Sequence, residues 1–249
     1  MSRIHDYAYK GLTRELQDEL SKGIDLNEVE KDGGCALHYA CQEGHYDIVN
    51  LLLNNSADIN IVTEDCDAPL FMATIGGHLD IVKLLIKKGC EIGTEERKEM
   101  LLINGVFSGD YKTVEYLFTN VIKNVAEEQY ALLYAAQENQ IEIAKYLINV
   151  GYNVNATDHN NGYTPLFSSC PEGFFEMTKL LLENGANPNH RDMFGSTCLH
   201  LACSFGKFDI VEILLQFSAD STIKDEDGKL PIDDAREHKE SEIVKLLSK

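Results

Sequence analysis

Positive charge is scarce in this sequence of 249 residues, because 22 lysines and arginines stand against 41 aspartates and glutamates, a net charge of −19. Proteins bind nucleic acid largely by replacing its counterions with cationic side chains. The same deficit of cations disfavours an anionic membrane surface. We therefore expect neither nucleic acid nor a membrane as a partner.

Long apolar runs are also missing, although 44% of the residues are hydrophobic, which is enough for a packed core. The sequence contains no stretch of about 18 apolar residues that could cross a membrane. The first residues, MSRIHDYAYKGL, lack the apolar segment of a secretory signal. The seven cysteines are scattered and odd in number, unlike those of a small disulfide scaffold. These absences predict a reducing compartment, the cytoplasm or the nucleus.

Motifs of common active sites are absent as well. The sequence contains no glycine-rich phosphate loop and no Gly-x-Ser-x-Gly elbow around a nucleophile. We therefore predict neither catalysis nor a cofactor. An enzyme, or a regulatory subunit that acts with one, stays the alternative.

What the sequence does contain is an internal repeat. The segments LHYACQEG (37–44), LFMATIGG (70–77), LFSSCPEG (166–173) and LHLACSFG (199–206) share a leucine, a small residue three positions later and a final glycine. LLYAAQEN (132–139) ends in Asn139, which also tolerates the left-handed backbone that the glycine provides. The anchor residues are Ile4, Leu37, Leu70, Leu102, Leu132, Leu166, Leu199 and Ile232, spaced by 33, 33, 32, 30, 34, 33 and 33 residues. A period this constant predicts a repeat protein.

Each repeat carries a second apolar segment, such as YDIVNLLLNNSADIN (46–60). Apolar residues recur there at Ile48, Val49, Leu52 and Leu53, which mark one face of a helix. A glycine-like position followed by Asn or Asp ends that helix. Each repeat therefore predicts a helix, a tight turn, a second helix and a polar turn.

The repeat resembles the ankyrin repeat family along essentially the whole chain. GYTPLF (162–167) keeps the family's Thr-Pro-Leu, STCLHLAC (196–203) its Thr-x-Leu-His-x-Ala, and GHLDIVKLLIKKG (77–89) its second-helix signature. The resemblance implies an all-α solenoid of stacked helix-turn-helix units with β-hairpin fingers at the junctions. One such unit cannot bury its apolar face alone, so both ends must be capped.

We predict a single domain, residues 1–249, of eight repeats whose first and last members are caps. The approximate bounds are 1–29, 30–62, 63–94, 95–124, 125–158, 159–191, 192–224 and 225–249. The repeat is irregular around the fourth unit, where the finger motif is missing twice. Residues 93–110 and 124–139 there predict helices that start early, the second capped by Asn124 and Glu127.

One spacing suggests a metal site. Cys198, His200 and Cys203 form Cys-x-His-x-x-Cys, and zinc takes such soft ligands. The same trio recurs at Cys35, His38 and Cys41, and the family resemblance implies that the histidine hydrogen-bonds the neighbouring finger. Because the repeat itself dictates these residues, we predict packing and no metal. A metal-stabilised array stays the alternative.

The predicted binding surface follows from the register of the repeat, since ankyrin repeats usually bind through fingers and the ends of first helices. Those positions are acidic in the first half of the sequence and aromatic in repeats 6 and 7. We expect burial to come from Tyr163, Met193, Phe194 and Phe205, and charge complementarity from Asp32, Glu64, Asp65, Asp67 and Glu172. Pro171 is expected to shorten the first helix of repeat 6 and reshape this region.

The sequence thus predicts a protein–protein interaction module: a scaffold, adaptor or inhibitor, monomeric by itself. Its partner would be a protein with a basic, partly apolar segment that docks in the concave groove. Two plainer alternatives remain open for the surface residues. The acids could form a solvated face that keeps the chain soluble, and Met193 and Phe194 could fold back onto the neighbouring finger.

Overall fold

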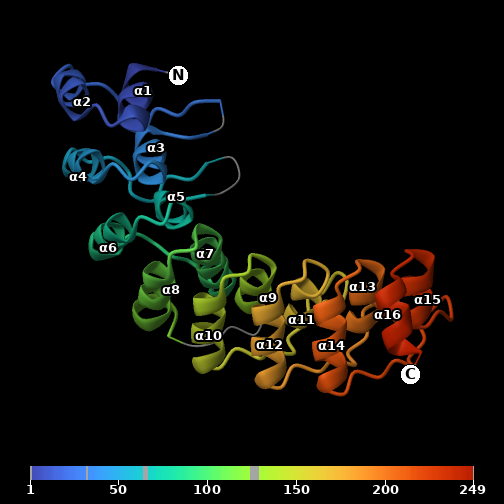
Figure 1. Ribbon diagram of the computed structural model, residues 1–249. Coiled ribbons are helices and arrows are strands. Elements are labelled where there is room, and N and C mark those ends of the chain that lie inside the picture. Colours follow the sequence, from blue (N-terminus) through green and yellow to red (C-terminus); the bar gives the residue numbers. More distant parts are fainter. Residues whose placement is uncertain (1, 32, 64–66, 124–128, 249) are drawn as a thin grey trace. The chain divides into compact units, whose positions relative to one another are not determined.

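The computed structural model describes residues 2–31, 33–63, 67–123 and 129–248. Regular structure in these ranges is helical, and none of their residues forms a β-strand (Figure 1). None of the helices found in these ranges is long and apolar enough to span a membrane. The chain divides into two compact units, Met1–Lys123 and Asn124–Lys249.

Helices in the first unit come in consecutive pairs joined by a tight turn. The pairs are α1 (Arg3–Lys10) and α2 (Thr13–Leu20), α3 (Ala36–Gln42) and α4 (Tyr46–Asn54), α5 (Pro69–Ile75) and α6 (Leu79–Lys87), and α7 (Glu95–Ser108) and α8 (Tyr111–Leu117). A short π-helix, η1 (Phe118–Ile122), continues α8. First helices contact first helices of the next pair, and second helices contact second helices. This stacking buries the apolar face that each pair exposes.

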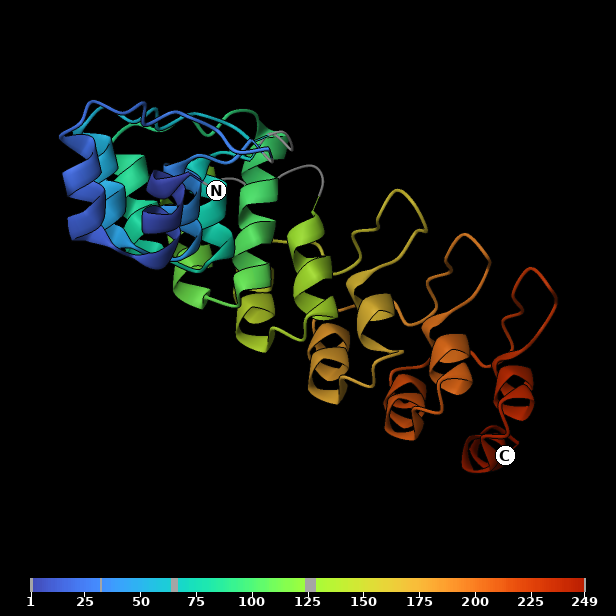
Figure 2. The same ribbon diagram turned by 90° about the horizontal axis from the view of Figure 1, so that it is seen from above.

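The second unit repeats the pattern. Its pairs are α9 (Tyr130–Gln137) and α10 (Ile141–Asn149), α11 (Pro165–Ser169) and α12 (Phe175–Glu183), α13 (Cys198–Ser204) and α14 (Phe208–Gln216), and α15 (Pro231–Glu237) and α16 (Ser241–Leu247). The loops that join one pair to the next project as fingers from one side of this unit (Figure 2). The repeat bounds inferred from the sequence stay a prediction.

The anchor positions of the repeat form the core. Ile4 is 4% exposed, and the anchors from Leu37 to Leu199 are completely buried. Ile232, the last anchor, is half-buried. Each repeat buries one leucine-like side chain at the same place in the stack, which explains why these anchors are spaced almost evenly along the sequence.

Tight turns between paired helices use a left-handed residue. Gly44, Gly77 and Gly206 have φ of 77°, 71° and 64°, where a Cβ atom is strained. Asn139 occupies the same position with φ of 53°, so the predicted tolerance of asparagine there is confirmed.

The predicted fingers are present as hairpin turns. Asp192 donates its backbone N–H to Ser196 O over 3.0 Å, and Asp225 donates to Lys229 O over 3.0 Å. Neighbouring fingers are joined as well, because Met193 N–H donates to Asn161 O over 3.0 Å. These few bonds close the turns without building a strand ladder, so the β-hairpins expected from the family are strandless within the described residues.

Two helices that start early were predicted around the fourth repeat, over residues 93–110 and 124–139, and the structure contains the first of them. α7 starts early, at Glu95, and its 14 residues exceed the seven to nine of its regular neighbours because Thr94 caps it and accepts from Arg97 N–H. The continuous helix predicted over 124–139 is wrong. Gln129 has a non-helical backbone, and its side-chain oxygen accepts from Asn153 N–H instead. The predicted cap residues Asn124 and Glu127 lie outside the described ranges.

Candidate functional site

A groove with a volume of about 500 Å³ runs along the ends of the first helices in the second unit. It lies at the C-terminal ends of α9, α11 and α13, where the register places binding residues. The groove is lined by Gln137, Glu138, Tyr163, Phe167, Ser168, Pro171, Glu172, Phe174, Leu201 and Phe205. Three of the predicted site residues, Tyr163, Glu172 and Phe205, therefore lie in one groove.

Aromatic rings form its apolar floor. Tyr163 stacks on Phe167 with ring centroids 5.5 Å apart and planes 18° from parallel. The Phe167 ring meets His190 edge-on at 5.9 Å, which fixes its orientation from below. Phe205 stands at the groove with 59% of its surface exposed. Phe167 is itself 1% exposed and supports Tyr163 from within, so the half-buried Tyr163 ring and the exposed Phe205 ring supply the apolar area that a partner can cover.

Acidic groups border this floor. Glu138 and Glu172 are exposed, and no lysine or arginine is among the lining residues. Burial, together with Asp192 and Asp158, raises the pKa of the Tyr163 hydroxyl, so this phenol stays protonated and can donate a hydrogen bond. The groove therefore favours an occupant that combines a cation with an apolar side chain.

Pro171 shapes the groove as predicted. α11 has five residues, whereas α9 and α13 have eight and seven. A proline has no N–H to continue the helical hydrogen bonds, so the helix ends before it. Pro171 itself lines the groove.

Met193 and Phe194 lie elsewhere, at the tip of the finger that precedes α13. Their side chains are 55% and 57% exposed, and neither lines the groove. The backbone around them is tied down, since Phe194 N–H donates to the Asp192 carboxylate over 2.9 Å and Phe194 O accepts from Glu226 N–H over 3.0 Å. The alternative in which these side chains fold back and are covered is thus not what the structure shows.

Besides Glu172 in the groove, the structure describes one other predicted acidic residue, Asp67. Asp67 is half-buried in the first unit, where its N–H donates to Thr63 Oγ1 over 3.1 Å and its carbonyl accepts from His38 Nε2 over 3.0 Å. Asp32, Glu64 and Asp65 lie outside the described residues. Their part in binding stays a prediction.

The first unit has apolar surface that sequence reasoning missed. Tyr9, Ile75 and Phe107 are 46%, 44% and 46% exposed, each at the end of a first helix. All three stand five residues after their anchors, the register position that Gln137 and Pro171 occupy in the groove of the second unit. Following that single position through every repeat would have found them.

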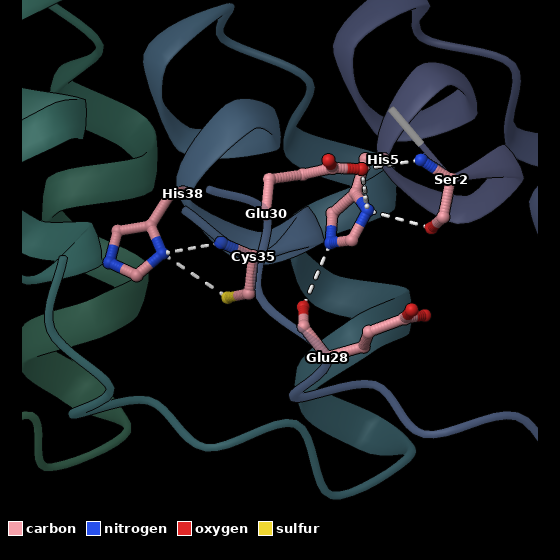
Figure 3. Close-up of polar contacts among 6 residues, drawn as sticks. All are labelled: Ser2, His5, Glu28, Glu30, Cys35 and His38. Atoms are coloured by element: carbon pink, nitrogen blue, oxygen red, sulfur yellow. Dashed lines mark hydrogen bonds and ion pairs between the residues drawn. The ribbon is translucent and has the colours of Figure 1, made fainter. Parts of the chain in front are cut away.

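The Cys-His trios pack as predicted. His200 Nδ1 accepts from Thr197 N–H over 3.1 Å, and its Nε2 donates to Lys229 O over 3.2 Å. His38 likewise accepts from Cys35 N–H over 3.1 Å (Figure 3). Its Nε2 donates to Asp67 O. Cys198 and Cys203 are buried, and burial raises the pKa of both thiols, which therefore stay protonated. Both histidine nitrogens are used in each trio, so these side chains join repeats to their fingers.

A serine, a histidine and a glutamate meet at the start of the chain (Figure 3). His5 is 1% exposed, and its Nδ1 lies 2.7 Å from Ser2 Oγ and 3.0 Å from Glu30 Oε1. Its Nε2 donates to Glu28 O over 2.8 Å. In a catalytic triad the serine and the acid contact opposite nitrogens of the ring. Here both contact the same one, so His5 repeats the finger-binding role of His38 and His200.

Comparison with known proteins identifies the repeat. A family model described as "Ankyrin repeats (3 copies)" matches residues 4–96 and 102–192, and one described as "Ankyrin repeats (many copies)" matches residues 181–235. Ankyrin repeat protein nuc-2 of Neurospora crassa is 29% identical over 194 residues, which cover 76% of this chain and 18% of that protein. The 2-5A-dependent ribonuclease of Mus musculus is 31% identical over 75 residues, 30% of this chain and 10% of that protein. The chain thus spans less than a fifth of the length of these relatives.

Among solved structures, the human ASB11 ankyrin repeat domain matches 94% of this chain and 92% of its own length. The TM-score is 0.52 and the sequence identity is 24%. This likeness establishes the fold.

Proposed function

The chain belongs to the ankyrin repeat family, whose domains generally bind other proteins, and we propose that it is an interaction module that docks a basic, partly apolar segment of a partner protein. The observation that carries this proposal is the groove of the second unit. Stacked Tyr163 and Phe167 form its floor, Phe205 stands exposed beside them, and Glu138 and Glu172 border it. An apolar side chain of the partner would cover the rings while a neighbouring lysine or arginine meets the carboxylates.

The finger tip offers a second point of contact. A hydrogen-bonded loop loses little backbone freedom when a partner covers its exposed methionine and phenylalanine side chains, so their burial contributes to affinity. Met193 and Phe194 have this arrangement. Asp32, Glu64, Asp65 and Asp67 belong to the same proposal as groups that attract a basic partner.

The role proposed for the whole molecule is that of a scaffold, adaptor or inhibitor without chemistry of its own. We place it in the cytoplasm or nucleus, as a monomer that binds neither nucleic acid nor membranes. A partner that is itself an enzyme would make the chain its regulatory subunit.

Alanine variants test the groove and the finger tip separately. The measurement is affinity capture of partners from the native cell, followed by the dissociation constant of each captured segment for the wild type, Phe205→Ala, Phe194→Ala and the double variant. Loss of a central aromatic contact costs about 2 kcal/mol, roughly thirtyfold in affinity. Phe175→Ala is the matched control, because this phenylalanine is 38% exposed on α12 and lines no part of the groove.

Equal binding by the wild type and the double variant would overturn the aromatic part of the proposal. The electrostatic part predicts that the association rate falls steeply as salt rises, because screening acts over about 10 Å at 0.1 M. An association rate that does not change with salt would overturn that part alone.

A further inference from the structure

In the first unit, the second helices α6 and α8 are neighbours (Figure 1). A second groove lies between these two helices. Its volume is about 470 Å³. It is lined by Leu79, Lys83, Lys112, Glu115, Tyr116, Thr119 and Asn120. Two lysines in one groove are unusual in a chain with so few cations.

Lys112 stands at a register position that is acidic in α4, α6, α10, α12, α14 and α16 and is otherwise cationic only at Arg14 of α2. Every other second helix of the described pairs has an acid in its first turn, namely Glu15, Asp47, Asp80, Glu142, Glu176, Asp209 or Glu242. An acid there is stabilised by the positive end of the helix dipole, whereas a cation is disfavoured. α8 carries its acid at the N-cap, where the Asp110 carboxylate accepts from Lys112 N–H, and its first turn has Lys112 and no acid. Helix stability therefore does not explain this lysine.

Lys83 is the second lysine that lines this groove. Its ammonium lies 5.1 Å from the centroid of the Tyr116 ring, which holds it over the groove. No ion pair of Lys83 or Lys112 is found within the described ranges, and the next cation on the same face of α6 is Lys87, four residues on. At the same register position of α12, by contrast, Lys179 lies 4.0 Å from Glu183.

The equivalent groove in the second unit shows the difference in charge. Between α12 and α14 the lining residues are Phe175, Asp209, Glu212, Ile213 and Gln216. Asp209 stands where α8 has Lys112, and Phe175 stands where α6 has Leu79. The groove between neighbouring second helices is therefore acidic in the second unit, whereas in the first unit it is lined by two lysines.

Carboxylates near the lysines already have partners. Glu115 accepts from the Tyr111 hydroxyl over 3.1 Å, and Asp110 accepts from Thr113 Oγ1 over 2.6 Å. Asp80 accepts from Ile81 N–H over 2.9 Å. Glu115 lines the groove and keeps its charge, so the two lining lysines leave a small excess of positive charge there, to which Lys87 adds from one turn further along α6.

The π-helix lengthens the groove. η1 follows α8 directly and brings Thr119 and Asn120 to its lining. Asn120 Nδ2 donates to Tyr116 O over 2.9 Å, which fixes the side chain beside the ring. Irregular π-turns within helices frequently mark functional sites.

From these contacts we infer that the groove between α6 and α8 binds an acidic segment of a partner protein. Carboxylates of the segment pair with Lys83, Lys87 and Lys112, and one apolar side chain covers Leu79 and Tyr116. A polyphosphate backbone or an anionic membrane needs many more cations than this face offers. The negative charge of the rest of the chain acts weakly here, because salt screens it beyond about 8 Å at 0.15 M.

The test uses the full chain and a fluorescein-labelled helical peptide in which glutamates recur at i and i+4 around one leucine. Fluorescence anisotropy measures its binding at about 0.15 M salt. We expect the variant Lys83→Gln, Lys112→Glu to bind the peptide at least about tenfold more weakly, because one cation is lost and one is reversed. Lys179→Gln is the matched control at the register position of Lys83 and leaves the affinity unchanged.

Further measurements separate the other outcomes. Because Lys112 opposes the helix dipole, the double variant should unfold at an equal or higher temperature than the wild type, so a loss of binding reflects the groove. Failure of the wild type to bind the peptide, or equal binding by the double variant, overturns the inference. So does competition by inorganic phosphate or by phosphatidylserine vesicles, which would identify a phosphate or lipid site instead.

Discussion

Replacing His200 by leucine tests how the repeats are joined. His200 is 2% exposed in α13, and it connects Thr197, the residue before that helix, with Lys229, the last finger residue before α15. Leucine is similar in volume to histidine and fills the site, but it makes no hydrogen bond. The substitution therefore leaves the Thr197 N–H without a partner and removes one of two hydrogen bonds to the Lys229 carbonyl, which still accepts from Asp225 N–H.

The expected cost follows from these two groups. An unsatisfied buried polar group costs about 1–3 kcal/mol. Thr197 is 1% exposed, so its N–H bears the larger penalty, while Lys229 is half-buried and its carbonyl bears less. We expect a total loss of about 2–4 kcal/mol in the free energy of unfolding. In a chain of this length that lowers the unfolding midpoint by roughly 5–15 °C.

The assay is urea unfolding followed by circular dichroism, in buffer that contains a chelator, together with amide hydrogen exchange. Exchange should accelerate first in α15 and α16, because the lost bond joins α13 to the finger that precedes α15. His238→Leu is the control. This exposed histidine bonds only Asp234 O, a carbonyl that water can also reach, so its loss costs under about 0.5 kcal/mol.

The same experiment decides between packing and a metal. If the trio of Cys198, His200 and Cys203 held a metal, the chelator would destabilise the wild type and His200→Leu would add little in its presence. If the trio packs, the chelator leaves the wild type unchanged and the full loss remains. A wild type that loses several kcal/mol on chelation would refute the reasoning.

Three further predictions concern single residues. Phe167→Ala should lower the unfolding free energy by about 3–5 kcal/mol in urea titrations, because the ring is 1% exposed and alanine leaves a cavity. Asn189→Ala should cost about 1–2 kcal/mol in the same assay, because this side chain donates to Ser218 O over 3.1 Å and accepts from Asp220 N–H over 2.7 Å. Burial raises the pKa of Cys90 to about 11, so its thiolate fraction at pH 8 is about a hundredfold below that of an ordinary thiol. Iodoacetamide labelling of the Cys90 peptide, followed by mass spectrometry, should accelerate about tenfold per pH unit between pH 8 and 10.

Much of the fold could be predicted from the sequence because the residues within each repeat are enough to indicate its helices and its turn. Leucine at Leu37, Leu70 and Leu199 recurs wherever a first helix must bury its face, and the left-handed turn residue is glycine or asparagine wherever the backbone needs it. The short α11 followed from Pro171 alone, since a proline cannot donate the next helical bond. These features are local, so one stretch of sequence is enough to see them.

Errors arose where local signals compete with partners far along the chain. The helix predicted over 124–139 failed at Gln129, whose side chain bonds Asn153 N–H in the next finger. The fingers were expected to form strands, yet a single closing bond such as that from Asp192 to Ser196 suffices in the described part. Neither outcome is visible in a window of a few residues.

The sequence by itself determined the family, the helix-turn-helix repeat and the packing role of His38 and His200, because side chains at a fixed period must occupy equivalent places in a stack. Only the tertiary structure decided which surface residues meet. It brought Tyr163, Glu172 and Phe205 into one groove, left Met193 and Phe194 on a separate finger tip, and set Lys83 beside Lys112. The physical reason is that a groove forms between neighbouring repeats, so its residues lie about one period apart in sequence and become neighbours only when the helices stack.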